Sequence, residues 1–101
     1  MNQALIQQYA VSLEDLLRRY ASADAEAARL LSALAPYLDD AKAGRILTPL
    51  EHIPGDYYFD EGTLRKYRDL EHAYSKFQIE VTGGEPPALI AFRNRVNAQK
   101  N

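Results

Sequence analysis

The acidic and histidine side chains are the residues of this chain whose types could support catalysis. Carboxylates suited to acid–base chemistry gather at two places, Asp39-Asp40 and the group Asp56, Asp60 and Glu61. The two histidines, His52 and His72, each follow a glutamate, and adjacent residues of a helix point to different faces, so such a pair does not chelate one ion. The chain has no cysteine and no ligand spacing typical of zinc sites. We therefore predict no catalytic residue, no metal and no cofactor. A small enzyme that combines Asp39 or one of the later acids with a histidine is a competing hypothesis.

Composition and charge narrow the class of function further. The chain has 101 residues, 47% of them hydrophobic and 26% charged, which is the balance of a folded globular protein. Its length predicts one domain over residues 1–101. A net charge of −2 argues against nucleic acid as a partner, because phosphate binding needs clustered Lys and Arg. No apolar run approaches the ~20 residues of a membrane span, and no basic segment precedes Glu14, the first charged residue. We expect a cytoplasmic protein without a membrane or nucleic-acid partner.

The elements that would position these side chains are helices. Apolar residues at steps of three and four predict three long helices, over 5–20, 27–41 and 60–81. Asp24 supplies cap chemistry for the second helix, and Gly44 can end it in a left-handed conformation. Pro36 lies inside the second helix, where it removes one backbone hydrogen bond and predicts a kink or a break over residues 32–35.

A long connection from Arg45 to Phe59 separates the second and third helices. Within it, Thr48-Pro49-Leu50-Glu51 has the pattern of a capping box with proline at the first helical position, and it predicts a short helix. Pro54-Gly55 would stop that helix. Asp60 is a good cap for the third long helix, with Glu61 in its first turn. Three consecutive aromatics, residues 57–59, cannot all face inward from a loop, so we expect at least one on the surface.

The C-terminal part of the chain leaves one choice open. Residues 77–82 alternate like a strand, but the three-four pattern continues through them and favours helix. The alternative is a short β-hairpin over 77–92 that turns at Gly83-Gly84. Pro86-Pro87 can open a last helix with apolar residues Leu89, Phe92 and Val96, in a tail whose basic residues are Arg93, Arg95 and Lys100. The predicted fold is all-α, a single small bundle of three long helices, a short helix and a C-terminal helix.

The connection and the start of the third helix combine aromatic with charged side chains. Aromatic residues anchor protein interfaces by burial, and carboxylates steer a basic partner. We therefore predict a protein-binding surface made of Asp56, Tyr57, Tyr58, Phe59, Asp60, Glu61 and Arg65. The stripe that follows is typical of a helical core, and its near-heptad spacing also allows pairing with a second helix: Leu64, Tyr67, Leu70, Tyr74 and Phe77.

The middle of the chain carries a pattern of short motifs shared with a known family. These motifs are Gly44-Arg45-Ile46-Leu47-Thr48-Pro49-Leu50, Gly55, Tyr58-Phe59-Asp60-Glu61, Leu64, Asp69-Leu70, Ala73-Tyr74 and Thr82-Gly83-Gly84. The pattern resembles small all-helical immunity proteins of bacterial type VI secretion systems, in particular those that guard against NAD(P)-hydrolysing toxins. Pro49 and Pro54 depart from it, and the N-terminal half has no specific match. The resemblance implies a cytosolic protein that occludes a toxin's active site and has no catalytic activity of its own.

Two hypotheses about binding follow from the sequence. The first is an immunity protein that neutralises a cognate toxin domain by covering its active site. The second is a helical adaptor or regulatory protein, as a monomer or a homodimer, whose partner the sequence does not identify.

Overall fold

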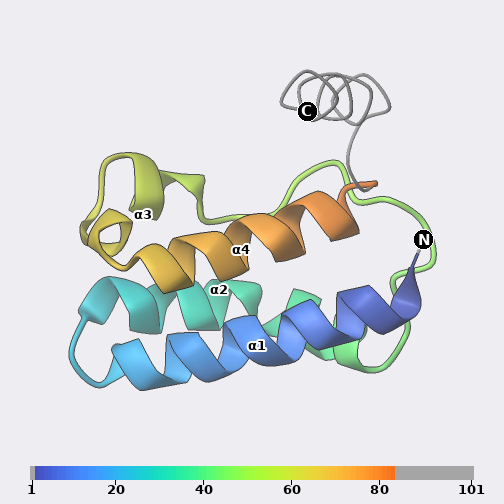
Figure 1. Cartoon of the computed structure of the whole chain (residues 1–101), viewed down its shortest axis with the longest axis horizontal. Helices are drawn as coiled ribbons and strands as arrows, with labels where there is room; N and C mark the ends of the chain where they lie inside the picture. The colour runs from blue at the N-terminus through green and yellow to red at the C-terminus, as the bar shows by residue number, and fades with distance from the viewer. Residues whose placement is uncertain (1, 84–101) are drawn as a thin grey trace, which may run out of the picture.

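The computed structural model describes residues 2–83, and every structural statement below concerns that part of the chain. Three long helices and two short ones follow one another as α1 (Gln3–Ala21), α2 (Ala25–Lys42), α3 (Asp56–Asp60), the 3-10 helix η1 (Thr63–Lys66) and α4 (Arg68–Val81) (Figure 1). The fold is thus all-helical, as predicted. Residues 77–81 are helical and no strand occurs within residues 2–83, so the β-hairpin is not formed there. The rest of that hairpin and the last predicted helix lie outside the described residues.

The first two helices form an antiparallel hairpin, and each begins at a capping side chain, of which the sequence predicted Asp24. The Asn2 side chain accepts a hydrogen bond from Leu5 N–H and starts α1, while the Asp24 side chain accepts one from Glu26 N–H and starts α2. The Lys42 ammonium lies 2.8 Å from the Glu14 carboxylate and joins the two helices near the far end of the hairpin. Gly44, at φ +73°, lies just beyond the end of α2.

Of the kink or break predicted at residues 32–35, the break is not formed, because α2 continues through Pro36. The proline ring is exposed, while Leu34 and Leu38 on either side are fully buried. Burial of two leucines stabilises the helix by about 3–6 kcal/mol, which offsets the cost of about 3 kcal/mol for a proline inside a helix.

Helix α4 runs antiparallel to α1, and the connection after α2 returns along α4 (Figure 1). Leu50 N–H donates to Val81 C=O at the C-terminal end of α4. The Tyr74 hydroxyl donates to Pro54 C=O, 2.9 Å away, further back along the same helix. Next to it, a Cβ added to Gly55 would lie 2.8 Å from Leu30 Cδ1 and from Tyr74 Oη. At Gly55 the connection therefore packs closely between α2 and α4.

Two predicted helix starts in this region are wrong. Residues 45–55 contain no helix, because Ile46 and Ile53 are both buried and Leu50 N–H is used by α4. The third long helix does not begin at Asp60, which instead ends the separate helix α3.

Packing of the core explains why the third long helix does not begin at Asp60. Phe59 and Leu64 are both buried, with 7% and 0% of their surfaces exposed. Residues five apart lie on different faces of a continuous helix, so the chain must break between them to bury both. It breaks at Glu61-Gly62, and α4 begins only at Arg68.

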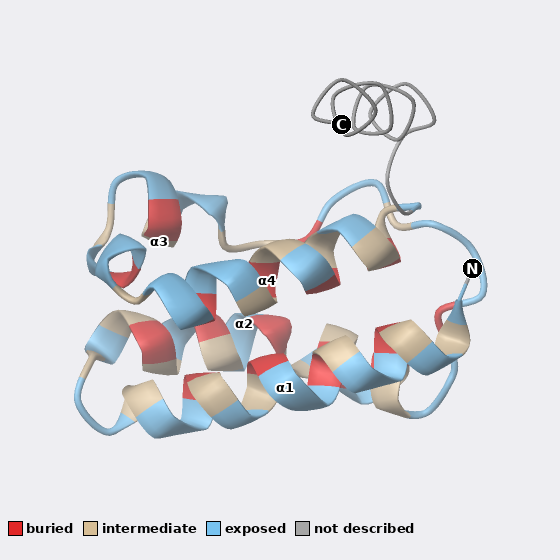
Figure 2. Ribbon diagram, in the orientation of Figure 1, coloured by how far each residue is buried: buried red, intermediate tan, exposed pale blue. Residues whose placement is uncertain are grey.

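The core lies where the three long helices, the connection and the short helices meet (Figure 2). The stripe predicted to be core is buried, since Leu64, Leu70, Tyr74 and Phe77 are each at most 2% exposed. Tyr67 is half-buried. This face of α4 is occupied within the chain and is not available to pair with a second copy. None of the helices within residues 2–83 has the length and apolar character needed to cross a membrane.

Candidate protein-binding surface

The corner formed by α3 and η1, residues 55–67, contains all seven residues predicted to bind a partner. Two of its side chains are fixed in the core. The Phe59 ring stacks on the Tyr74 ring with centroids 4.7 Å apart, and Leu64 is fully buried. The inclusion of Phe59 in the binding surface is therefore wrong, because its side chain faces inward. Its burial holds the rest of α3 in place.

The first turn of α2 holds the other side of the corner. Both carboxylate oxygens of Asp24 accept hydrogen bonds from the Thr63 hydroxyl, at 3.0 and 2.9 Å, and one also accepts from the Tyr67 hydroxyl at 3.1 Å. The Glu26 carboxylate accepts from Thr63 N–H at 3.1 Å. Two acids of one helix turn thus position η1.

These contacts also determine the ionisation of Asp24. Desolvation by burial acts to raise the pKa of its carboxyl, but hydrogen bonds from Thr63, from Glu26 N–H and from Tyr67 act in the opposite direction. The hydrogen bonds outweigh burial, and the pKa of Asp24 lies below its ordinary value. The charged form is the one that holds the corner.

The chain between the two short helices requires a glycine. A Cβ added to Gly62 would overlap the Glu26 carboxylate and lie 2.9 Å from the backbone of Tyr58. The close approach brings η1 against α2 and leaves no room for a side chain.

Asp56 ties the beginning of α3 to α4. Its carboxylate accepts a hydrogen bond from the Gln78 side chain at 2.9 Å and a longer one from the Tyr74 hydroxyl at 3.4 Å. Burial, and then the charges of Asp56 and Asp60, raise the pKa of the Tyr74 hydroxyl well above its ordinary value. Asp56 is exposed, but its carboxylate is engaged inside the chain, which gives it a positioning role.

Tyr57 is the aromatic residue that projects from this corner. Its side chain is 63% exposed, and its ring meets the half-buried Tyr58 ring edge-on with centroids 5.8 Å apart. This result confirms that at least one of the three consecutive aromatics lies on the surface. They lie in the short helix α3 and not in a loop, and the helix directs Tyr57 outward and Phe59 inward.

A shallow hollow lies beside Tyr57. It encloses about 470 Å³ and is lined by Glu26, Tyr57, Glu61, Gly62, Thr63, Arg65 and Lys66. Among the predicted residues, Tyr57, Glu61 and Arg65 meet here, and Asp60 is exposed on the same short helix. Glu26, Thr63 and Lys66 were not predicted. Lys66 adjoins a predicted residue, whereas Glu26 is far away in sequence and no local signal connects it to the corner.

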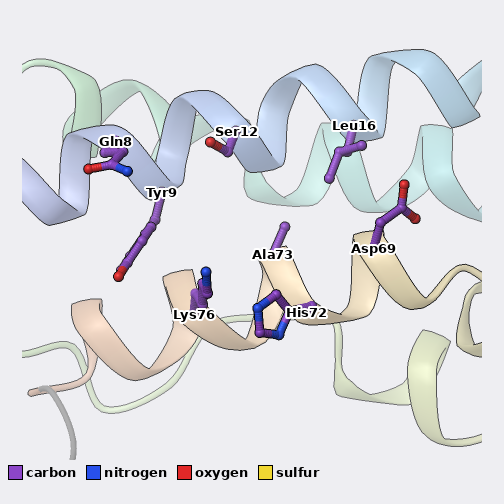
Figure 3. A pocket seen from close by; sticks show the side chains of 8 residues that line it. All are labelled: Gln8, Tyr9, Ser12, Leu16, Asp69, His72, Ala73 and Lys76. Carbon is purple, nitrogen blue, oxygen red and sulfur yellow. The ribbon is translucent and has the colours of Figure 1, made fainter.

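A second hollow lies between α1 and α4 and bears on the enzyme hypothesis. It encloses about 210 Å³ and is lined by Gln8, Tyr9, Ser12, Leu16, Asp69, His72, Ala73 and Lys76 (Figure 3). It brings a histidine, a carboxylate and a serine to one groove. The Asp69 carboxylate accepts hydrogen bonds from the Tyr20 hydroxyl at 2.8 and 3.0 Å.

The contacts described in this groove do not include those of a serine hydrolase. Within residues 2–83, neither Ser12 nor His72 forms a side-chain hydrogen bond. Ser12 comes from α1 and His72 from α4 (Figure 3). A serine nucleophile needs a hydrogen-bonded base that a third group orients, and that chain of contacts is not formed. The acids named as catalytic candidates, Asp39, Asp56, Asp60 and Glu61, do not line this groove.

Metal binding has no candidate site in the described region either. Residues 2–83 contain no group of three or more His, Cys, Asp or Glu side chains placed to hold an ion. His52 lies exposed in the connection, away from the groove that His72 lines.

Comparison of the chain with models of protein families, with curated proteins and with solved structures finds no match.

Proposed function

We propose that this protein is a non-enzymatic protein-binding module that docks through the α3–η1 corner. The observation that carries the proposal is the 63% exposure of Tyr57 on a corner whose neighbouring residues, Phe59 and Leu64, are buried. Tyrosine is enriched among the residues that dominate binding energy. A large exposed ring on a fixed support is therefore a suitable anchor.

The support beneath Tyr57 reduces the entropic cost of binding. Hydrogen bonds from Thr63 to Asp24 and to Glu26 hold η1, and the stacking of Phe59 on Tyr74 holds α3. A surface that is ordered before binding loses less conformational freedom when a partner docks. The corner thus has the preorganisation that tight inhibitors need.

The charges around Tyr57 suit a protein partner. Asp60 and Glu61 are exposed near the ring, and Arg65 and Lys66 are exposed across the hollow. A charged rim around an apolar anchor is the usual arrangement of a protein interface and favours rapid, selective association.

We further propose that the partner is a toxin domain and that the protein is its immunity protein. The resemblance of the middle of the chain to type VI immunity proteins supports this finer proposal. In this mechanism, Tyr57 enters the mouth of the toxin's active site and the corner excludes the substrate. The protein would act in the cytoplasm of the cell that produces it and would contribute no reacting group.

The test uses a candidate NAD(P)-hydrolysing toxin domain, which is purified and mixed with this protein. Binding is measured by titration calorimetry, and the toxin's NAD(P) hydrolysis is measured with and without the protein. A triple variant, Tyr57→Ala with Glu61→Ala and Arg65→Ala, is compared with the control Val11→Ala, which shortens another exposed apolar residue on α1, 43% exposed.

We expect the unmodified protein and the control to inhibit the toxin and the triple variant to lose at least about 2 kcal/mol of binding free energy, as when an interface anchor is truncated. Unchanged inhibition by the triple variant, with helix content intact, would remove the corner as the docking site. Binding without inhibition would reject the occlusion mechanism and leave a binding module.

A further inference from the structure

The end of the bundle opposite the corner carries the most exposed large apolar residue of the described chain. Leu47 is 74% exposed, against 63% for Tyr57 and 43% for Val11. It lies in the connection, three residues before Leu50, whose N–H donates to Val81 C=O. Leu47 is therefore close to the point where α4 ends.

The chain leaves the described region beside the same segment. Gly83, at φ +122°, follows α4, and a Cβ added to it would lie 3.7 Å from Pro49 Cβ. Residues 84–101 continue from this point. Leu89 is six residues beyond Gly83, and an extended chain spans about 3.3–3.6 Å per residue, so it can reach about 20 Å. Leu47 lies within about 11 Å of Leu50 by the same measure.

The composition of residues 84–101 complements this end of the bundle. The segment contains apolar residues at Leu89, Ile90, Phe92 and Val96, and basic residues at Arg93, Arg95 and Lys100. On the bundle, Glu51 and Glu80 adjoin Leu50 and Val81, the two residues that share a hydrogen bond. Neither acid forms an ion pair with another described residue. The segment thus offers apolar and basic side chains, and this end of the bundle offers an exposed leucine and two acids.

We propose that residues 84–101 dock on the end of the bundle and that Leu89 and Phe92 cover Leu47. The basic side chains that follow would lie near Glu51 and Glu80. Burial of apolar side chains is favourable, and Leu47 is an exposed apolar residue close to the point where residues 84–101 begin. The docking would be intramolecular and would leave the α3–η1 corner free.

Cysteine labelling tests this proposal directly, because the chain has no cysteine. Leu47→Cys and Val11→Cys are prepared separately in the full-length chain, and the rate of reaction of each thiol with a maleimide is measured. The exposures of Leu47 and Val11 in residues 2–83 predict that Leu47→Cys reacts at least as fast as Val11→Cys. If residues 84–101 cover the site, Leu47→Cys reacts about tenfold more slowly, as expected when the open state is a minor population.

A second variant identifies the covering segment. Leu89→Ala with Phe92→Ala, introduced into each cysteine variant, is expected to restore fast labelling at position 47 and to leave position 11 unchanged. Circular dichroism checks that the helices persist. Three results would each overturn the proposal: labelling at position 47 as fast as at position 11, slow labelling that the double alanine variant does not change, or protection that rises with protein concentration. The last result would assign the cover to a second copy.

Discussion

The α1–α2 hairpin and the segment from Ala43 to Tyr67 differ in what determines their structure. In the hairpin, apolar residues recur at helical spacing and the caps lie next to the helices that they start, as with Asn2 and Asp24. In the later segment, contacts to distant residues set the path. Leu50 N–H donates a hydrogen bond to Val81 C=O, and Thr63 donates hydrogen bonds to Asp24 and Glu26. The proposed docking surface lies in this second region, so distant residues of the chain control its shape.

Outside the α3–η1 corner, the largest expected effect on stability is in the hairpin core. Leu34 is fully buried, and Leu34→Ala should lower the free energy of unfolding by about 2–5 kcal/mol, because it removes contacts and leaves a cavity. Urea unfolding followed by circular dichroism measures this change. Since the core is continuous with Phe59 and Leu64, the corner should unfold in the same transition. Separate transitions for the hairpin and the corner would show that the two regions are not one cooperative unit.

The next effect concerns the close packing of the connection between α2 and α4. Gly55→Ala places a Cβ 2.8 Å from both Leu30 and Tyr74 at a φ of +133°, and overpacking of this kind costs about 1–3 kcal/mol. Gly44→Ala is the matched control, because φ is also positive, at +73°, but nothing lies within 4 Å. We expect it to cost only about 1 kcal/mol for the left-handed backbone. Equal losses from the two substitutions would mean that backbone conformation, and not packing of the connection, determines the result.

Asp24 joins the two regions, and its removal should have an intermediate effect. Asp24→Ala deletes the cap of α2 and the acceptor for Thr63 and Tyr67, and we expect a loss of about 2 kcal/mol from the cap and the hydrogen bonds together. Asp24→Asn keeps a good cap residue and should cost less. Thermal unfolding of the three proteins measures both values. Equal stability of the alanine and asparagine variants would reduce the role of Asp24 to the ties with η1.

The pH dependence of stability should also show the contribution of Asp24. The folded protein holds the pKa of Asp24 below its ordinary value, which for an unfolded chain is about 3.9. The contribution of Asp24 is therefore complete above that value and is lost as pH falls through the lower, folded-state pKa. Stability measured between pH 6 and acid should decline less for Asp24→Asn than for the unmodified protein. Parallel declines would mean that other carboxylates account for the acid sensitivity.

The smallest expected effect on stability belongs to the proposed anchor. Tyr57 is 63% exposed, so Tyr57→Ala should change the free energy of unfolding by no more than about 0.5 kcal/mol, as surface substitutions do. Phe59→Ala, two residues away and buried, should cost about 3–5 kcal/mol. The pair separates binding from folding within one short helix. A large loss of stability from Tyr57→Ala would place that ring in the folding of the corner.

The sequence predicted the hairpin because its signals are local. The helical spacing, the cap at Asp24 and the glycine after α2 act within a few residues, and the structure contains all three. The capping box at residues 48–51 is equally local, but it is overridden. Burial of Ile46 and Ile53 and the bond from Leu50 to Val81 favour an irregular path, and neither contact has a signature in a single sequence.

The sequence predicted only the part of the candidate site that local signals determine. The clustering of aromatic residues indicated that one of them must be exposed, and Tyr57 is. The sequence could not assign Phe59 to the core, because that requires knowing that the chain breaks before Leu64. It also could not bring Glu26 to Thr63, since the two residues meet only after α2 and η1 have packed together.

The positions of Asn2 and of the end of α4 relative to the corner have a practical consequence. Asn2 and the C-terminal end of α4 lie at one end of the bundle, and α3 lies at the other (Figure 1). A fluorophore, an affinity tag or a sensor surface attached near Asn2 would therefore lie at the end of the bundle away from α3, which carries Tyr57. Immobilisation in this orientation suits kinetic measurements with an incoming partner, whereas random coupling through lysines would modify Lys66 in the hollow itself.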